Sequence, residues 1–236
     1  MLIIGIESAS QTASVAIWQD NIIKAEYTVN NTKTHSQTLL PMLDEIMKMS
    51  GTSLGDADAV AVSGGPGSFT GLRIGSAMAK GLGLAADIPL VHVPTLDAMA
   101  YQHTACAMLI CPMLDARRKN VFCGIYENNE GFRVLMESSA LAVTELIEKL
   151  NAMGRGVLLL GDGVSACKDI LEETLRVPYI MADAVGNRPR AGAVASLGAV
   201  YFSQGKAISS FEEHPDYLRL SQGEQARNAR LAKEEQ

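Results

Sequence analysis

The sequence has few cysteines, no long apolar run and no excess of positive charge. Its 20 Lys and Arg stand against 26 Asp and Glu, which gives a formal net charge of −6. Affinity for nucleic acid comes mainly from Lys and Arg that neutralise phosphates, so this balance argues against strong nucleic-acid binding without a basic partner. No apolar stretch reaches membrane-spanning length, and the first residues lack the basic and apolar regions of a signal peptide. We therefore expect a soluble, cytoplasmic protein with no membrane contact.

Residue patterns that mark common catalytic sites are also missing. The four histidines include no H-E-x-x-H motif, and Leu39 stands four positions after His35, where a helical metal pair needs its second ligand. No G-x-S-x-G elbow marks a nucleophile. We expect neither a bound metal nor a catalytic residue. The cysteines form no C-x-x-C pair and no zinc spacing, which favours four free thiols: Cys106, Cys111, Cys123 and Cys167.

What the chain does have is 47% hydrophobic residues, enough for one large domain or two small ones. Apolar runs predict strands and helical spacing predicts helices in the first half: strands at 2–8, 12–18, 21–29, 57–63 and 89–93, helices at 35–50, 69–86 and 95–103. Thr34 is placed to cap the first helix and Gly51 to end it.

The second half of the chain repeats this order. Placing Asp115 on Glu7, an offset of 115 − 7 = 108, lays residues 110–126 over residues 2–18. The later elements follow in sequence: a helix at 143–153, a strand with a glycine turn at 157–163 and a helix to about residue 176. Both halves therefore run strand, strand, strand, helix, strand, helix.

A duplicated βββαβα unit resembles the actin, Hsp70 and sugar-kinase superfamily, whose members bind nucleotide between two lobes. We therefore predict an α/β fold of two ribonuclease-H-like lobes with the actin-like ATPase (ASKHA) architecture. The first lobe, with the dimerisation helices, is expected at residues 1–103, the second at 104–222, and a flexible tail at 223–236. A fold alone does not determine function, which depends on the residues of the site.

Residues 63–83, SGGPGSFTGLRIGSAMAKGLG, contain seven of the 21 glycines. A P-loop is excluded, because Gly65 and Gly71 are one residue too far apart and Leu72-Arg73 stands where Lys-Ser is required. Ser68 is placed to cap the helix that follows. Small residues recur every four positions along one face of this helix: Gly71, Gly75, Ala79 and Gly83. Each glycine inside a helix lowers the stability of the helix, and the close approach of another element would compensate for this loss.

Either the chain's own sheet or a partner helix can make this approach. The helix at 69–86 has little polar surface, so we predict that it forms a subunit interface together with the helix at 35–50. A bulky residue at Gly75 is then expected to block the partner and leave the chain folded. The predicted contact residues are His35, Leu39, Leu43, Met47, Phe69, Gly71, Leu72, Ile74, Gly75, Met78, Ala79 and Leu82.

Two polar segments are candidates for binding phosphates. Superfamily members place a carboxylate near magnesium and hydroxyls near phosphate at the first strand end, so ATP or ADP with magnesium is a candidate ligand of Glu7, Ser8, Ser10 and Asp115. Alternatively, these carboxylates bond local backbone amides. The run Arg117-Arg118-Lys119 is either an anion or tRNA contact or a solvated hairpin tip.

Five segments together resemble the bacterial TsaB (YeaZ) family and extend over almost the whole chain. The glycine segment is the most specific of them, and the five are IESAS at 6–10, HSQTLLP at 35–41, GPGSFTGLRIG at 65–75, DARR at 115–118 and YLR at 217–219. Two departures from the family pattern, Glu7 in place of Asp and Ala9 in place of a hydroxyl residue, speak against nucleotide binding in the first lobe.

The resemblance implies a non-catalytic subunit of the complex that makes threonylcarbamoyladenosine (t6A) at adenosine 37 of tRNA. Such a subunit pairs with the catalytic TsaD through the first-lobe helices, works with the ATPase TsaE, meets tRNA only through the complex and holds no cofactor tightly. A homodimer through the same helices is expected when the partner is missing, since burying an exposed apolar face against a second copy is favourable. Two alternatives stay open: an ATP-dependent kinase or ATPase with Glu7 and Asp115 on magnesium, and a glycoprotease-like metallopeptidase.

Overall fold

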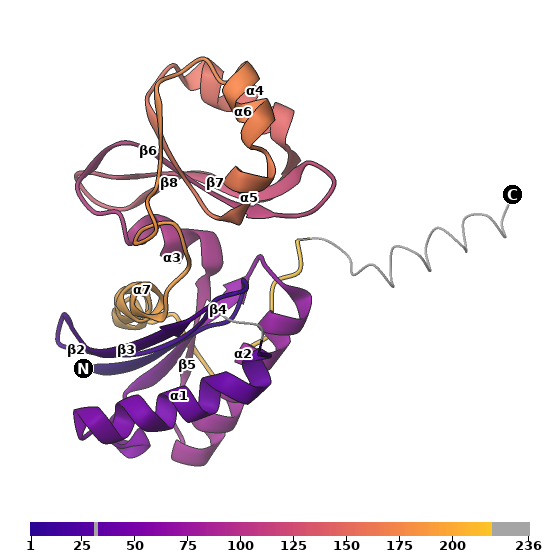
Figure 1. The fold of residues 1–236 in the computed structure, drawn as a ribbon. Helices are drawn as coiled ribbons and strands as arrows, with labels where there is room; N and C mark the ends of the chain where they lie inside the picture. The colour runs from indigo at the N-terminus through magenta and orange to yellow at the C-terminus, as the bar shows by residue number, and fades with distance from the viewer. Residues whose placement is uncertain (31–32, 219–236) are drawn as a thin grey trace, which may run out of the picture.

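The computed structural model describes residues 1–30 and 33–218, so the predicted tail at 223–236 and Arg219 lie outside the described residues. Two lobes are visible, each built around one sheet (Figure 1). The elements of the first half of the chain are β1 (Leu2–Glu7), β2 (Ala13–Gln19), β3 (Ile22–Val29), α1 (His35–Ser50), β4 (Ala59–Gly65), α2 (Phe69–Ala86), β5 (Leu90–Pro94) and α3 (Thr95–Tyr101). Those of the second half are β6 (Cys106–Asp115), β7 (Asn120–Asn128), β8 (Arg133–Ala142), α4 (Val143–Met153), β9 (Val157–Leu160), α5 (Asp162–Ala166), α6 (Lys168–Thr174), β10 (Tyr179–Met181), α7 (Ala191–Ser203) and β11 (Ala207–Ile208).

The two sheets have the same internal order. In the first, β3-β2-β1-β4-β5 lie side by side, and in the second the order is β8-β7-β6-β9-β10. In each sheet the first strand pairs antiparallel with the second and parallel with the fourth. Glu7 ends β1 and Asp115 ends β6, so these two residues occupy equivalent places. The predicted duplication of a βββαβα unit is confirmed.

The first sheet is covered on both faces. Every residue of β1 is buried, which its unbroken apolar run favours. Helices α1 and α2 cover one face, with Leu39, Leu43 and Ala79 in the core, and α7 covers the other (Figure 1). The layers are therefore helices, sheet and helix, with α1 and α2 side by side on the outside.

The chain returns to the first lobe after β10. Helix α7 packs on β1, β2 and β4, and β11 pairs antiparallel with β5. The predicted second-lobe range of 104–222 therefore includes residues 191–208 that belong to the first lobe. The physical reason is apolar packing. Ile3, Ala61 and Val93 lie on the second face of the first sheet, and α7, which is almost wholly apolar, is buried against them.

A shared apolar cluster joins the two lobes. Leu96 and Met99 of α3 pack with Ile110, Tyr126 and Leu160 of the second lobe, and all five are fully buried. In the second lobe the predicted helix after residue 163 is divided into α5 and α6. Among the described residues, no helix is long and apolar enough to cross a membrane.

Candidate functional site

Local sequence signals set the ends of α1 and α2. Thr34 is the N-cap of α1, its backbone N–H donates to Gln37 Oε1 at 3.3 Å, and Gly51 ends the helix with a left-handed φ of 64°. The Ser68 Oγ accepts a hydrogen bond from the Gly71 N–H at 3.2 Å and caps α2. The predicted caps and stop are confirmed, and the two helices start and end as their sequences indicate.

The small-residue face of α2 packs inside the first lobe. A Cβ added at Gly71 would lie 2.1 Å from the backbone oxygen of Ser8, and one at Gly75 would lie 2.2 Å from Ser8 Oγ. Ala79 is fully buried in the same core. The prediction that a partner helix approaches this face is wrong, because the end of β1 already occupies that space. A leucine at Gly75 would accordingly collide with Ser8, so it tests folding and not partner binding.

The turn before α2 also closes on the chain itself. The Ser68 N–H donates to the Ala9 backbone oxygen at 2.6 Å, and a Cβ at Gly67 would lie 2.3 Å from that same oxygen. Gly65 has a φ of 126°, which L side chains rarely adopt, and lies against the backbone of Asp216. The glycines of this turn therefore allow backbone-to-backbone packing between β1, α2 and the C-terminal segment.

Another small-residue stripe of α2 points outward. Ala77, Gly81 and Ala85 recur every four residues, are exposed, and nothing lies within 4 Å of a Cβ added at Gly81. Leu84 beside them is 56% exposed. The sequence shows this second spacing too, offset by two positions from the buried stripe and therefore on the opposite side of the helix. Its exposure leaves room for another helix to approach α2 closely.

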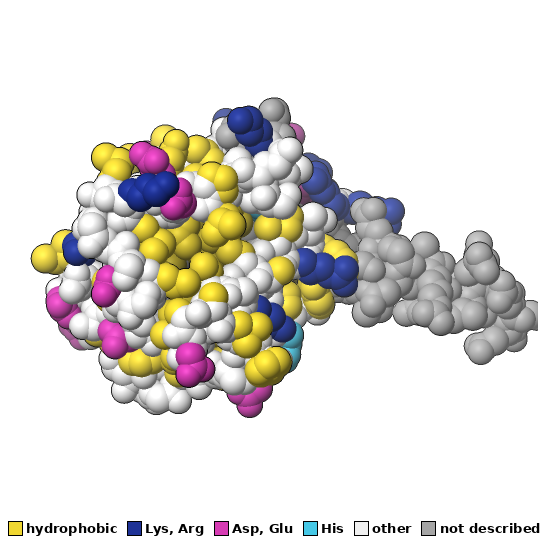
Figure 2. Space-filling model, turned by 90° about the horizontal axis from the view of Figure 1, so that it is seen from below, with side chains coloured by type: hydrophobic (Ala, Val, Ile, Leu, Met, Phe, Trp, Pro, Cys, Tyr) yellow, Lys and Arg dark blue, Asp and Glu magenta, His cyan; other side chains and the backbone are white. Residues whose placement is uncertain are grey.

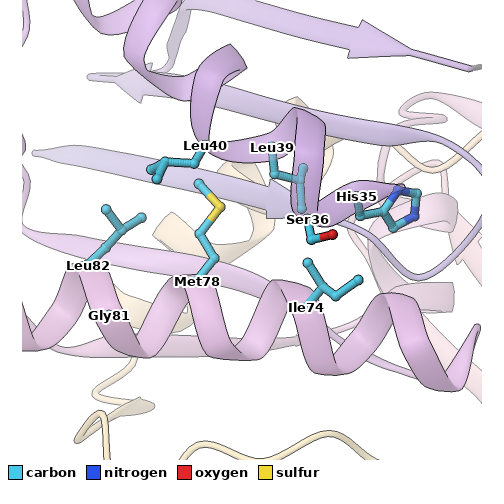
Figure 3. A pocket seen from close by; sticks show the side chains of 8 residues that line it. All are labelled: His35, Ser36, Leu39, Leu40, Ile74, Met78, Gly81 and Leu82. Atoms are coloured by element: carbon cyan, nitrogen blue, oxygen red, sulfur yellow. The ribbon is translucent and has the colours of Figure 1, made fainter. Parts of the chain in front are cut away.

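An apolar groove runs between α1 and α2 next to this stripe. Its volume is about 320 Å³, and its lining residues are His35, Ser36, Leu39, Leu40, Ile74, Met78, Gly81 and Leu82 (Figure 3). The side chains of Leu40, Met78 and Leu82 point towards one another there, and Leu40 is 56% exposed. Hydrophobic side chains gather around a hollow on this face of the molecule (Figure 2). Apart from His35, none of the described residues that line the groove has an ionisable side chain.

The structure separates the predicted contact residues into two groups. His35, Leu39, Ile74, Met78 and Leu82 line the groove, and the search by sequence missed Ser36, Leu40 and Gly81. The other predicted residues do not line it: Leu43, Leu72, Gly71, Gly75 and Ala79 are buried in the first lobe, and Met47 and Phe69 are half-buried. Helical spacing alone cannot tell which of two neighbouring faces the sheet covers.

Two of the four predicted nucleotide ligands line the cleft between the lobes and two do not. Glu7 and Ser8 are fully buried and do not line the cleft between the lobes, whereas Ser10 and Asp115 do. Glu7 Oε1 accepts the Ala9 N–H at 2.6 Å, and burial raises the pKa of Glu7 to about 7. Asp115 accepts the Arg117 N–H at 2.8 Å. These are the local backbone contacts that the sequence left as the alternative.

The basic run forms a left-handed turn at the wall of the cleft. Arg117, Arg118 and Lys119 have φ values of 69°, 56° and 60° and are exposed. Arg117 and Arg118 line the cleft, whereas Lys119 Nζ donates to the Ala166 backbone oxygen at 3.2 Å. The turn is thus a hairpin tip and at the same time part of the cleft surface.

Comparisons with known proteins fit this geometry. The family model described as "TsaD: tRNA N6-adenosine threonylcarbamoyltransferase" matches residues 23–225. The tRNA threonylcarbamoyladenosine biosynthesis protein TsaB of Escherichia coli (strain K12) is 32% identical, over 93% of this chain and 95% of that protein. The chain belongs to the TsaB (YeaZ) family. The TsaB of Bacillus subtilis (strain 168) is 30% identical, over 95% of this chain and 96% of its own length.

A solved structure confirms the fold of this TsaB-family chain. YeaZ from Pseudomonas aeruginosa superposes with a TM-score of 0.79 at 24% identity, and the match covers 92% of this chain and 99% of that one. The predicted α/β fold of two lobes is therefore confirmed. Of the late family segment YLR, Tyr217 and Leu218 are described: the Tyr217 ring lies 4.7 Å from that of Phe69, and Arg73 Nε donates to the Tyr217 hydroxyl at 3.1 Å.

Proposed function

We propose that this chain is a non-catalytic subunit in the biosynthesis of tRNA threonylcarbamoyladenosine. It pairs with TsaD through α1 and α2, holds the active site of TsaD in shape and works with TsaE. The names of its relatives support the pathway, since both the E. coli and the B. subtilis protein are called tRNA threonylcarbamoyladenosine biosynthesis protein TsaB. The match to the TsaD family model supports a partner of the same fold.

The apolar groove between α1 and α2 carries this proposal. Two ridges of apolar side chains with a hollow between them can accept the ridge of another helix, and small residues at the contact let the helix axes come close. The outward stripe of Ala77, Gly81 and Ala85 supplies such residues beside Leu40 and Leu84. A helix pair of a partner laid on this face would bury these side chains and form a four-helix bundle.

The described residues also favour a supporting role over chemistry. No group of three or more His, Cys, Asp or Glu side chains within residues 1–30 and 33–218 is placed to hold a metal ion. Leu39, where a helical metal pair would need its second ligand, lies in the core of the first lobe with 1% exposure. We expect the isolated chain to have no activity on its own.

Co-purification with TsaD tests the interface. Leu40→Glu places a charge in the groove and Gly81→Leu fills the outward stripe, and each is expected to abolish the complex. Leu135→Glu is the matched control, because Leu135 is 41% exposed on β8, far from the groove. Circular dichroism checks that all variants fold. Undiminished complex formation by Leu40→Glu and Gly81→Leu would reject the proposed interface.

Reconstitution tests the function itself. TsaD, TsaE, tRNA and the threonylcarbamoyl donor are combined with and without this chain, and modified adenosine is measured. Full modification without the chain would contradict the proposed subunit.

When TsaD is absent, we expect a homodimer through the same groove, which light scattering should show and which Leu40→Glu should convert to a monomer.

A further inference from the structure

The cleft between the lobes is a hollow distinct from the groove between α1 and α2. It has a volume of about 1150 Å³ and receives residues from both lobes, which include the start of α2 and the turn after β6. Arg117 and Arg118 line it from that turn, and Arg188 lines it from the segment that leads into α7. The groove used for the proposed partner lies outside this cleft apart from His35 and Ile74, which line both.

Each acidic side chain of the cleft makes a contact within the chain. Asp115 pairs with the Arg117 guanidinium at 3.3 Å, and Asp162 Oδ1 accepts the Asp115 N–H at 2.9 Å. Asp216 Oδ2 lies 3.0 Å from His92 Nε2. Each of these three carboxylates therefore already uses at least one oxygen in a contact within the chain.

Two cations of the cleft stand without partners. Within the described part of the chain, the guanidinium groups of Arg118 and Arg188 make no hydrogen bond or ion pair. Arg118 is exposed and Arg188 is half-buried at the cleft wall. The cleft is lined by four cationic side chains, those of Lys33, Arg117, Arg118 and Arg188, and by three carboxylates, so its formal charge is +1, although the whole chain has a net charge of −6.

The backbone holds Arg118 in a costly conformation. Each left-handed residue other than glycine is disfavoured by roughly 1–2 kcal/mol, and three follow one another at 117–119. The Asn120 side chain donates to the carbonyls of Arg117 and Arg118 at 3.2 Å each, and Asp115 accepts the Arg117 N–H. Specific hydrogen bonds thus keep two arginines at the cleft wall.

Aromatic rings lie at the same cleft. Phe69 and Tyr217 both line it, their ring centroids are 4.7 Å apart, and the Arg73 guanidinium carbon lies 3.9 Å from the Phe69 centroid. Tyr217 is 42% exposed. Cations next to exposed aromatic faces bind single-stranded nucleic acid, because phosphates meet the cations and unpaired bases stack on the rings.

We propose that the cleft binds an RNA segment with unpaired bases, with Arg118 and Arg188 on phosphates and Tyr217 against a base. The inference rests on the proposed function, in which the complex acts on tRNA. A nucleoside triphosphate fits less well, because its magnesium ion is usually held by one or two carboxylates, and each carboxylate of the cleft already makes a hydrogen bond or an ion pair within the chain. With two phosphate contacts the binding is weak and salt-dependent, as expected of a surface that acts within a complex.

Fluorescence anisotropy with a labelled anticodon stem-loop RNA tests the cleft, with the full chain as the binding protein. At about 50 mM salt we expect a dissociation constant of about 1–100 µM, weakened by about 200 mM salt. Arg118→Glu and Arg188→Glu are each expected to weaken binding at least about tenfold, and Tyr217→Ala about fivefold or more. Arg133→Glu, on exposed β8 outside the cleft, is the matched control and should stay within about twofold.

The outcomes separate this inference from the proposed function. Weakened RNA binding by the cleft variants with intact TsaD co-purification supports it. No RNA binding by the wild-type chain up to about 100 µM protein, or equal binding by all variants, overturns it and leaves the TsaD interface standing. Displacement of the RNA by micromolar magnesium ATP overturns it in favour of a nucleotide site. Loss of TsaE binding without loss of RNA binding overturns it in favour of a protein surface.

Discussion

The hydroxyl of Tyr126, in the second lobe, donates a 2.8 Å hydrogen bond to Asp97 Oδ1 in the first. The hydroxyl of Tyr201 donates to the other oxygen of Asp97 at 3.1 Å. Asp97 is 6% exposed, so a buried carboxylate links α3, β7 and α7 beside the shared apolar cluster. Burial raises the pKa of Asp97, and the two tyrosine hydrogen bonds oppose this shift. The relative placement of the lobes depends on this contact as well as on apolar packing.

Tyr126→Phe removes one donor from Asp97 and keeps the ring. The free energy of unfolding is expected to fall by about 1–2 kcal/mol, because a buried carboxylate loses a hydrogen bond. Urea denaturation measures it. Tyr27→Phe, at a residue that is 41% exposed, is the control and should change little. Equal values for both variants would show that the contact adds nothing to stability.

Two glycines of α2 should respond oppositely to the same substitution. Gly71→Ala is expected to destabilise the chain by about 1–3 kcal/mol, because the new Cβ meets the Ser8 backbone oxygen. Gly81→Ala should stabilise it by about 0.5–1 kcal/mol, because the site is open and alanine favours a helix. Thermal and urea unfolding compare the two. A gain at Gly71 would contradict the buried packing of this face.

Glu7 should make stability depend on pH. Its folded-state pKa of about 7 lies above the unfolded value of 4.5, so its stabilising contribution is complete below about pH 4.5 and is lost as the pH rises through 7. The loss amounts to about 3 kcal/mol at 1.36 kcal/mol per pH unit. Glu7→Gln removes it, so the variant should match the wild type near pH 4.5 and exceed it at pH 8. Urea denaturation across this range measures the difference, and parallel curves would refute the assignment.

The C-terminal segment 209–218 supports α2 through a buried carboxylate. Ser76 Oγ donates to Glu213, and His92 Nδ1 lies 3.6 Å from Glu213 Oε1. Burial alone would raise the pKa of Glu213, but the nearby His92 ring and the hydrogen bond from Ser76 outweigh it and the pKa is lowered. Glu213→Ala should cost about 1–3 kcal/mol of stability, because the Ser76 hydroxyl loses its buried partner.

Glu212→Ala is the matched control for this change. Glu212 is the exposed neighbour and bonds the Ser209 N–H at 2.9 Å, so its loss should stay within about 0.5 kcal/mol. Limited proteolysis of the segment gives a second measurement, since a released segment is cut faster. Equal effects of the two substitutions would show that Glu213 does not hold the segment on α2.

Local patterns were sufficient for the elements of the first lobe up to α3 and for the duplication, but not for the elements after residue 163. The bounds of α1 and α2 follow from apolar spacing together with Thr34, Gly51 and Ser68, all of which act within one or two helical turns. The alignment of Asp115 on Glu7 holds because both end the first strand of equivalent sheets. No helix was predicted at 191–203, so both α7 and its place on the first sheet were missed.

Residue patterns alone were enough to predict the two βββαβα units and the family, and they indicated that another group packs closely on α2 at Gly71 and Gly75. The fold was needed to show that the approaching group is Ser8, directly after the chain's own first strand, and that Gly81 lies on the face left open. The reason is that helical spacing shows on which side of a helix another group packs closely, but it does not show which group this is. Here the packing group is Ser8, which lies more than sixty positions away in the sequence. Partner surfaces are those that the chain leaves uncovered, and burial is a property of the whole fold.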